Sequence, residues 1–108
     1  MPKDDGLVPV VLLTLRMAGW WAERLPSGTA HSGRMHMARA GSPDVVAIRP
    51  GTKRYDPPLP MLVECKHRTG KLRRAQVELS VWCAERGILY VVVRSVDDVA
   101  KLVEGGAG

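Results

Sequence analysis

The sequence predicts an α/β domain, and the C-terminal half of the chain carries most of the signal. Residues 88–93, "ILYVVV", form a nearly continuous apolar run that is typical of a fully buried strand. An earlier apolar strand, at 61–67, precedes a helical stretch at 72–86 that ends before Gly87. A strand, a helix and a strand in this order make one βαβ unit, so we expect parallel strands and a right-handed crossover.

The remaining elements are a helix near each end of the chain and two further strands. Residues 7–18 are typical of a helix because Pro9 falls in the first turn, where a missing N–H costs little, and Gly19 follows the end. Ser95 and Asp98 resemble a capping arrangement for a last short helix. The expected order is α-β-β-β-α-β-α, with elements at 7–18, 20–25, 44–50, 61–67, 72–86, 88–93 and 96–103.

Composition is that of an ordinary globular chain. The 108 residues, of which 45% are hydrophobic and 25% charged, have room for a single domain, 1–108. No apolar run reaches the roughly 18 residues of a membrane span, so no membrane association is expected. Cys65 and Cys83 form no CxxC pair and resemble small core residues, which favours a reducing, cytoplasmic location.

The net charge of +5 is concentrated in one stretch, "KHRTGKLRR" at 66–74, which we call the basic segment. It carries five Lys and Arg side chains and no acidic one. Such a cluster suits a polyanion, because neutralised phosphates release condensed counterions. A solvated basic loop is the alternative.

The strand that leads into the basic segment contains an unusual pair of charges. Side chains alternate along a strand, so Glu64 and Lys66 should share one face. The apolar side chains of Met61, Val63 and Cys65 should share the other. Glu64 and Lys66 could form an ion pair on a surface strand, with no catalytic role. Alternatively, they could belong to a catalytic site.

A third charged residue favours chemistry. Asp44 begins the preceding strand, and a hairpin joined by the proline-rich connection 51–60 would bring it level with Glu64. The prolines should keep that connection out of the sheet interior. Two carboxylates, completed by the backbone carbonyl of Cys65, would suit Mg²⁺ or Mn²⁺. Lys66 could then position a water molecule or neutralise developing negative charge.

These residues resemble a known family. "GSPDVVAI" followed by "MLVECKHRTGKLRRAQVELSVWCAERGILYVVVRSVDDVAKLV" is similar to the VRR-NUC branch of the PD-(D/E)xK nuclease superfamily, most densely from Gly41 to Val103. The resemblance implies a restriction-endonuclease-like core with a mixed central sheet flanked by helices. It also implies Mg²⁺- or Mn²⁺-dependent hydrolysis of phosphodiester bonds in DNA.

The resemblance assigns roles to particular residues. Asp44 and Glu64 become metal ligands, Lys66 becomes the water-orienting or charge-stabilising lysine, and Gln76 supports the site from the following helix. A solvent-facing Gln76 is the alternative. The charges themselves, apart from the resemblance, predict contacts to DNA from His67, Arg68, Lys71, Arg73, Arg74 and, in the loop before Asp44, Arg34 with His31 and His36. A solvated helix start is the alternative for Lys71, Arg73 and Arg74.

The family often places a further acid, usually Glu, on the first helix, and this chain has none there. Asp4 and Asp5, just before Leu7, are the nearest candidates for a metal ligand. Their alternative role is to cap that helix or to interact with its dipole.

Small stand-alone members of this branch resemble Holliday-junction resolvases of phages and act as homodimers. The resemblance therefore implies branched DNA as the substrate and a homodimer as the active form. Trp20, Trp21 and Trp82, with the apolar first helix, are candidates for the dimer interface, and the monomer core is their alternative location. A non-cleaving DNA-binding module and a structural subunit are the competing functions.

Overall fold

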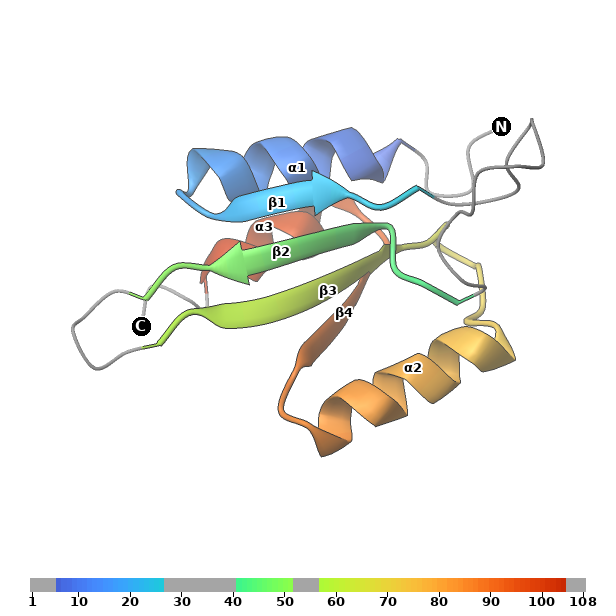
Figure 1. Cartoon of the computed structure of the whole chain (residues 1–108). Coiled ribbons are helices and arrows are strands. Elements are labelled where there is room, and N and C mark those ends of the chain that lie inside the picture. Colours follow the sequence, from blue (N-terminus) through green and yellow to red (C-terminus); the bar gives the residue numbers. More distant parts are fainter. Residues whose placement is uncertain (1–5, 27–40, 52–56, 105–108) are drawn as a thin grey trace.

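The computed structural model describes residues 6–26, 41–51 and 57–104 and has the predicted order of elements (Figure 1). The helices and strands are α1 Leu7–Met17, β1 Trp21–Arg24, β2 Val45–Arg49, β3 Leu59–Cys65, α2 Arg74–Glu85, β4 Leu89–Val93 and α3 Val96–Glu104. The cap predicted for the last helix is present, since the Asp98 N–H donates to the Ser95 hydroxyl at 3.1 Å.

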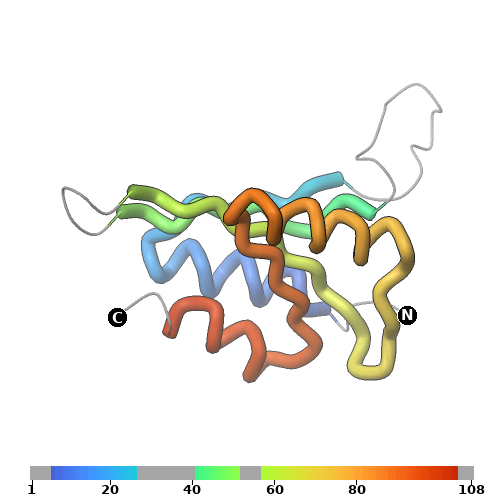
Figure 2. Tube along the Cα trace, turned by 90° about the horizontal axis from the view of Figure 1, so that it is seen from below, coloured from blue at the N-terminus to red at the C-terminus, as the bar shows by residue number. Residues whose placement is uncertain are grey.

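The strands form one mixed sheet in the order β1-β2-β3-β4. The first three strands pair in antiparallel fashion, and β3 pairs with β4 in parallel, as expected for the βαβ unit. Helices α1 and α3 lie on one face of this sheet, and α2 lies on the other (Figures 1 and 2). The predicted mixed sheet flanked by helices is therefore confirmed.

The start of β3 differs from the prediction. Pro60 was expected outside the sheet, yet it belongs to β3 and stands opposite Ile48 of β2. The Val63 carbonyl accepts from the Asp44 N–H, so odd-numbered residues of β3 bond toward β2 and even-numbered ones toward β4. Strand β4 begins only opposite Met61. Pro60 has no N–H to donate toward the β4 side, and no strand of the described residues lies opposite it on that side. A proline therefore costs no ladder hydrogen bond at this position.

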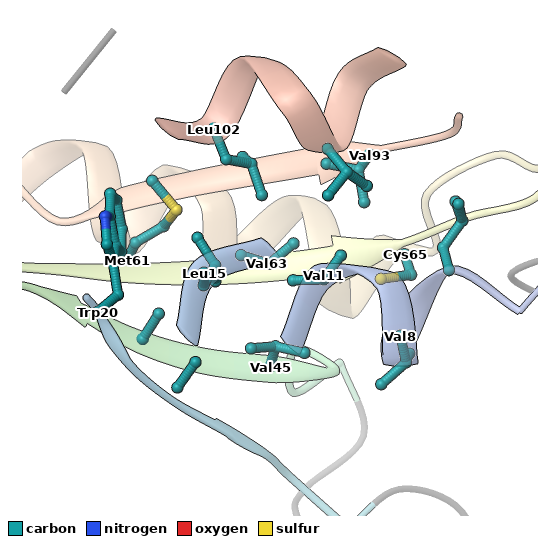
Figure 3. Packing of buried hydrophobic residues seen from close by; sticks show 14 residues of the cluster. Val8, Val11, Leu15, Trp20, Val45, Met61, Val63, Cys65, Val93 and Leu102 are labelled. Atoms are coloured by element: carbon teal, nitrogen blue, oxygen red, sulfur yellow. The ribbon is translucent and has the colours of Figure 1, made fainter. Parts of the chain in front are cut away.

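The hydrophobic core lies between the sheet and the α1–α3 layer (Figure 3). The buried side chains of α1 recur at helical spacing, and those of β2 and β3 alternate along their strands. The cluster comprises Leu7, Val8, Val11, Leu15, Trp20, Ala22, Val45, Ala47, Met61, Val63, Cys65, Val93, Val99 and Leu102. Met61, Val63 and Cys65 therefore share the core face, as predicted.

Both cysteines are buried, Cys65 in this cluster and Cys83 on α2, and neither forms a disulfide. This agrees with their expected role as small core residues. Within the part of the chain that the structure describes, no helix has the length and apolar character needed to cross a membrane.

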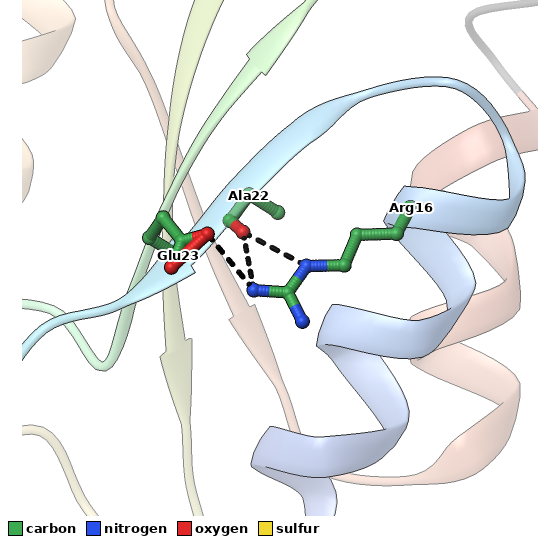
Figure 4. Close-up of polar contacts among 3 residues, drawn as sticks. All are labelled: Arg16, Ala22 and Glu23. Atoms are coloured by element: carbon green, nitrogen blue, oxygen red, sulfur yellow. Dashed lines mark hydrogen bonds and ion pairs between the residues drawn. The ribbon is translucent and has the colours of Figure 1, made fainter.

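A polar contact ties α1 to the edge of the sheet (Figure 4). The Arg16 guanidinium donates to the Ala22 carbonyl from Nε at 3.1 Å and from Nη2 at 2.8 Å, and it also pairs with Glu23 at 3.0 Å. The Leu25 N–H donates toward β2, and backbone groups alternate in direction along a strand. Ala22 is three residues from Leu25, so its carbonyl points away from β2. Arg16 therefore occupies an edge carbonyl that could otherwise pair with a strand of another chain.

Two leucines on α1 give a matched test of this packing. Leu15 is fully buried, whereas Leu13 is 61% exposed. Leu15→Ala should lower the free energy of unfolding by about 2–5 kcal/mol through lost burial and a residual cavity. Leu13→Ala should change it by less than about 0.5 kcal/mol. Urea denaturation of both variants measures the difference, and similar losses would show that α1 is not docked as described.

Candidate functional site

The pairing of β2 with β3 places two carboxylates side by side. Val45 pairs with Val63, so Asp44 stands opposite Glu64. The Asp44 N–H donates to the Val63 carbonyl at 3.0 Å, and Asp44 Oδ2 accepts from the Cys65 N–H at 2.7 Å. Because Val45 and Val63 face the core, alternation turns both acids toward the α2 side of the sheet.

Glu64 is buried and is held from α2. Its exposed fraction is 4%, and Gln76 Nε2 donates to Glu64 Oε2 at 3.1 Å. Gln76 Oε1 in turn accepts from the Arg73 N–H at 2.8 Å. Only the amide oxygen can accept that bond, so the NH₂ group must point to Glu64. Gln76 is 8% exposed, and its alternative location facing solvent is wrong.

The burial of Glu64 also excludes the simplest explanation of the charged pair in β3. A surface ion pair requires an exposed carboxylate, and Glu64 is covered. A carboxylate removed from water costs free energy unless donors or a cation compensate it. The Gln76 amide supplies one of the donors that compensate the burial of the Glu64 carboxylate.

Lys66 lies just past the strand rather than within it. Strand β3 ends at Cys65, two residues before the predicted end. The ladder nevertheless continues by one bond, from the Lys66 N–H to the Val93 carbonyl at 2.9 Å. One further residue of strand alternation would put Lys66 on the same face as Glu64.

The basic segment forms a turn followed by the start of α2. The Gly70 N–H donates to the His67 carbonyl at 3.0 Å, and the Thr69 N–H donates to His67 Nδ1 at 3.3 Å. The remaining side chains predicted to contact DNA here, Arg68, Lys71, Arg73 and Arg74, are exposed, as is His67. Arg74 pairs with Glu78 at 3.2 Å, but both are largely solvated, so this pair contributes little.

Several predicted site residues lie outside the described residues. These are Asp4 and Asp5, the candidates for a further metal ligand, and His31, Arg34 and His36 of the loop before Asp44. Within residues 6–26, 41–51 and 57–104, no group of three or more His, Cys, Asp and Glu side chains could hold a metal. The described donor set is therefore the carboxylate pair with nearby backbone carbonyls. Mg²⁺ is commonly held by one or two carboxylates and keeps several waters, so the pair fits such an ion.

Tyr90 belongs to this side of the sheet, although its sequence context gave no sign of it. It pairs with Leu62, two residues before Glu64, and therefore faces α2. Its hydroxyl is buried and makes no hydrogen bond to the residues that the structure describes. Burial raises the pKa of the Tyr90 hydroxyl far above its ordinary value, and the negative charges of Glu64 and then Asp44 raise it further. The pKa of the Tyr90 hydroxyl therefore depends on the charges of both carboxylates.

The mixed sheet has helices on both faces and carries an acid pair where β2 begins and β3 ends, an arrangement that is consistent with a nuclease-type α/β fold. The family model for the VRR-NUC domain matches residues 28–97, and the chain belongs to this family. A solved structure described as "VRR_NUC domain" superposes with a TM-score of 0.70 at 23% identity, covering 96% of this chain and 97% of that one. That likeness shows a common fold. A comparison with curated proteins gave no match.

Gly41 lies close to α2, three residues before Asp44. The importance of this close approach can be tested by comparison with a second glycine. The φ of Gly41 is +89°, and a Cβ built there would lie 2.7 Å from the Ala75 Cβ on α2. Gly19 has a similar φ, +91°, with nothing within 4 Å. Gly19→Ala should cost about 1 kcal/mol through left-handed backbone strain alone.

Gly41→Ala should lower the free energy of unfolding by about 1–3 kcal/mol more than Gly19→Ala, because the added methyl group also overlaps α2. Chemical denaturation of both variants measures the difference. Equal losses would mean that the segment before Asp44 does not pack on the helix that carries Gln76.

Tyr90→Phe tests the environment of the buried hydroxyl. Removing an oxygen that lacks a hydrogen bond should leave the free energy of unfolding at neutral pH unchanged or higher. Unfolded tyrosine loses its proton near pH 10, whereas folded Tyr90 keeps it, so the unfolded state binds fewer protons and stability falls above about pH 10. That decline should be shallower in Tyr90→Phe, as urea titrations from about pH 9 to 11 would reveal; parallel curves would contradict it.

Proposed function

We propose that this chain is a metal-dependent, structure-selective endonuclease that hydrolyses phosphodiester bonds in DNA. The observation that carries the proposal is the pairing of Asp44 with the buried Glu64, on the face of the sheet where Lys66 also belongs. Membership of the VRR-NUC family supports it. The exposed cations of the basic segment give such an enzyme a surface for a phosphate backbone.

Asp44 and Glu64 are the residues that would hold Mg²⁺ or Mn²⁺, and the Cys65 carbonyl is a further candidate. The Cys65 N–H donates to Asp44, and in a strand the C=O of the same residue points to the same side. A bound divalent cation would supply Lewis acidity, both lowering the pKa of water and stabilising charge on a phosphate oxygen.

The protein's own contribution is to position charge before the substrate arrives. Gln76 fixes one carboxylate oxygen of Glu64, while its own oxygen is held by the start of α2. The Lys66 ammonium would orient the attacking water or offset negative charge that develops on the phosphate. Because Glu64 is shielded from water, its charge would act in a low-dielectric setting, where electrostatic interactions are stronger.

Branched DNA, such as a Holliday junction, is the substrate we propose, with a homodimer as the active form. Two active sites related by a two-fold axis would suit paired cuts in a four-way junction. Trp20 is 8% exposed and belongs to the core, as does the inner face of α1. Trp21 and Trp82, 53% and 46% exposed, are the tryptophans left to form an interface. Light scattering of the purified chain would give its mass.

We also propose a reducing, cytoplasmic setting for this enzyme. The support is the pair of buried thiols, Cys65 and Cys83, which act as core residues and form no disulfide with each other. Disulfides are rare in the cytosol, where such thiols persist.

The test is a cleavage assay on a four-way junction, a flap and a linear duplex of matched sequence, with Mg²⁺, Mn²⁺ or EDTA. Junction cutting should require the metal. Lys66→Ala should lower the rate by about 10²-fold or more, because it removes charge stabilisation at the reacting phosphate. Lys101→Ala is the matched control, since it removes an exposed lysine of α3, on the opposite face of the sheet.

Each result separates the alternatives. Equal cutting of flap and duplex would keep the nuclease and exclude junction selectivity. Tight binding with no cutting under either metal would overturn the nuclease and favour a non-cleaving DNA-binding module. Equal activity of Lys66→Ala and Lys101→Ala would remove Lys66 from the chemistry.

A further inference from the structure

Arg94, which directly follows β4, reaches across to the turn inside the basic segment. Its Nη1 atom donates to the His67 carbonyl at 2.9 Å and to the Gly70 carbonyl. These carbonyls lie at the two ends of the turn 67–70, and they are 27 and 24 residues from Arg94 in the sequence. One guanidinium thus holds both ends of a turn that belongs to a different part of the chain.

The backbone of Arg94 is fixed independently of that turn. Its N–H donates to Asp98 Oδ2 at 2.9 Å, in the first turn of α3. One residue earlier, the Val93 carbonyl accepts from the Lys66 N–H, the last bond of the parallel ladder. The side chain of Arg94 therefore continues, past the end of the ladder, the attachment of the β3 end to the β4 end.

This contact changes the charge that the turn presents. Carbonyl oxygens carry partial negative charge, which opposes the approach of a phosphate. The Arg94 guanidinium covers two of them, while the flanking side chains of Arg68 and Lys71 remain exposed. Arg suits this task better than Lys because its planar group presents several donors in a fixed arrangement.

We propose that Arg94 is a positioning residue, which sets the 67–70 turn so that Lys66 and the exposed cations of the basic segment meet the same DNA backbone. The inference rests on the proposed nuclease function but assigns to Arg94 no contact with the reacting phosphate. It acts through the turn.

The experiment compares Arg94→Gln and Arg94→Lys with Arg86→Gln. Arg86 is the matched control because it has the same charge and also donates to a backbone carbonyl, that of Trp82, at the far end of α2. Binding to a four-way junction is measured with Ca²⁺ in place of the catalytic metal. Amide hydrogen exchange at Gly70, whose N–H donates to His67, reports on the turn without DNA.

Arg94→Gln should weaken junction binding at least about tenfold more than Arg86→Gln at equal net charge, and should speed exchange at Gly70. Arg94→Lys, which keeps the charge but loses the planar group, should fall between Arg94→Gln and the wild type. Melting temperatures of the two Gln variants should be similar, because Arg94→Gln loses two hydrogen bonds and Arg86→Gln loses one hydrogen bond together with the stacking on the Trp82 ring.

Two failures can be told apart. If the wild type binds the junction and both Gln variants bind equally, Arg94 acts only as a charge, and the positioning role is overturned while the nuclease stands. If the wild type binds no DNA, the proposed function falls, and the role of Arg94 falls with it. Loss of binding in step with a collapse in melting temperature would also overturn the inference, since a structural role would then suffice.

Discussion

The register between β2 and β3 is the constraint on which the rest of the structure depends. Val45 opposite Val63 turns two apolar side chains into the core and, one residue along, turns Asp44 and Glu64 together to the other face. A slip of one residue would exchange the faces of every side chain, burying acids in the core and exposing valines to α2. The register that forms the core is therefore the same one that forms the site.

Helix α2 converts this pair of acids into an organised site. Gln76 holds Glu64, and the close approach of Gly41 to Ala75 draws the segment before Asp44 against the start of the same helix. Each contact supports the other, because the helix cannot move without losing both. The cost of keeping a carboxylate out of water is offset within the same small region, where the amide of Gln76 replaces a water donor.

Much of this was predictable from sequence, for identifiable physical reasons. Strong periodicity and the βαβ rules fixed the order of elements, and strand alternation brought Asp44 level with Glu64. The inward face of α2 was not predictable from apolar periodicity, because Val77, Val81 and Trp82 stay exposed while a polar residue is buried. Only the family resemblance pointed to Gln76. The place of Pro60 depends on where a neighbouring strand begins, and the contact of Arg94 joins segments that no local pattern relates. The roles of Asp4, Asp5 and Arg34 remain predictions.

The two faces of the sheet serve separate needs. The apolar cluster lies with α1 and α3, while the acid pair, Gln76 and Tyr90 lie with α2. Substitutions in the first layer should therefore change the free energy of unfolding and leave substrate recognition unchanged. Substitutions of the site side chains in the second layer should change recognition, whereas a substitution at the contact of Gly41 with α2 should change stability as well. The side chains that form the site can therefore change over evolution while the apolar cluster of the described residues is kept.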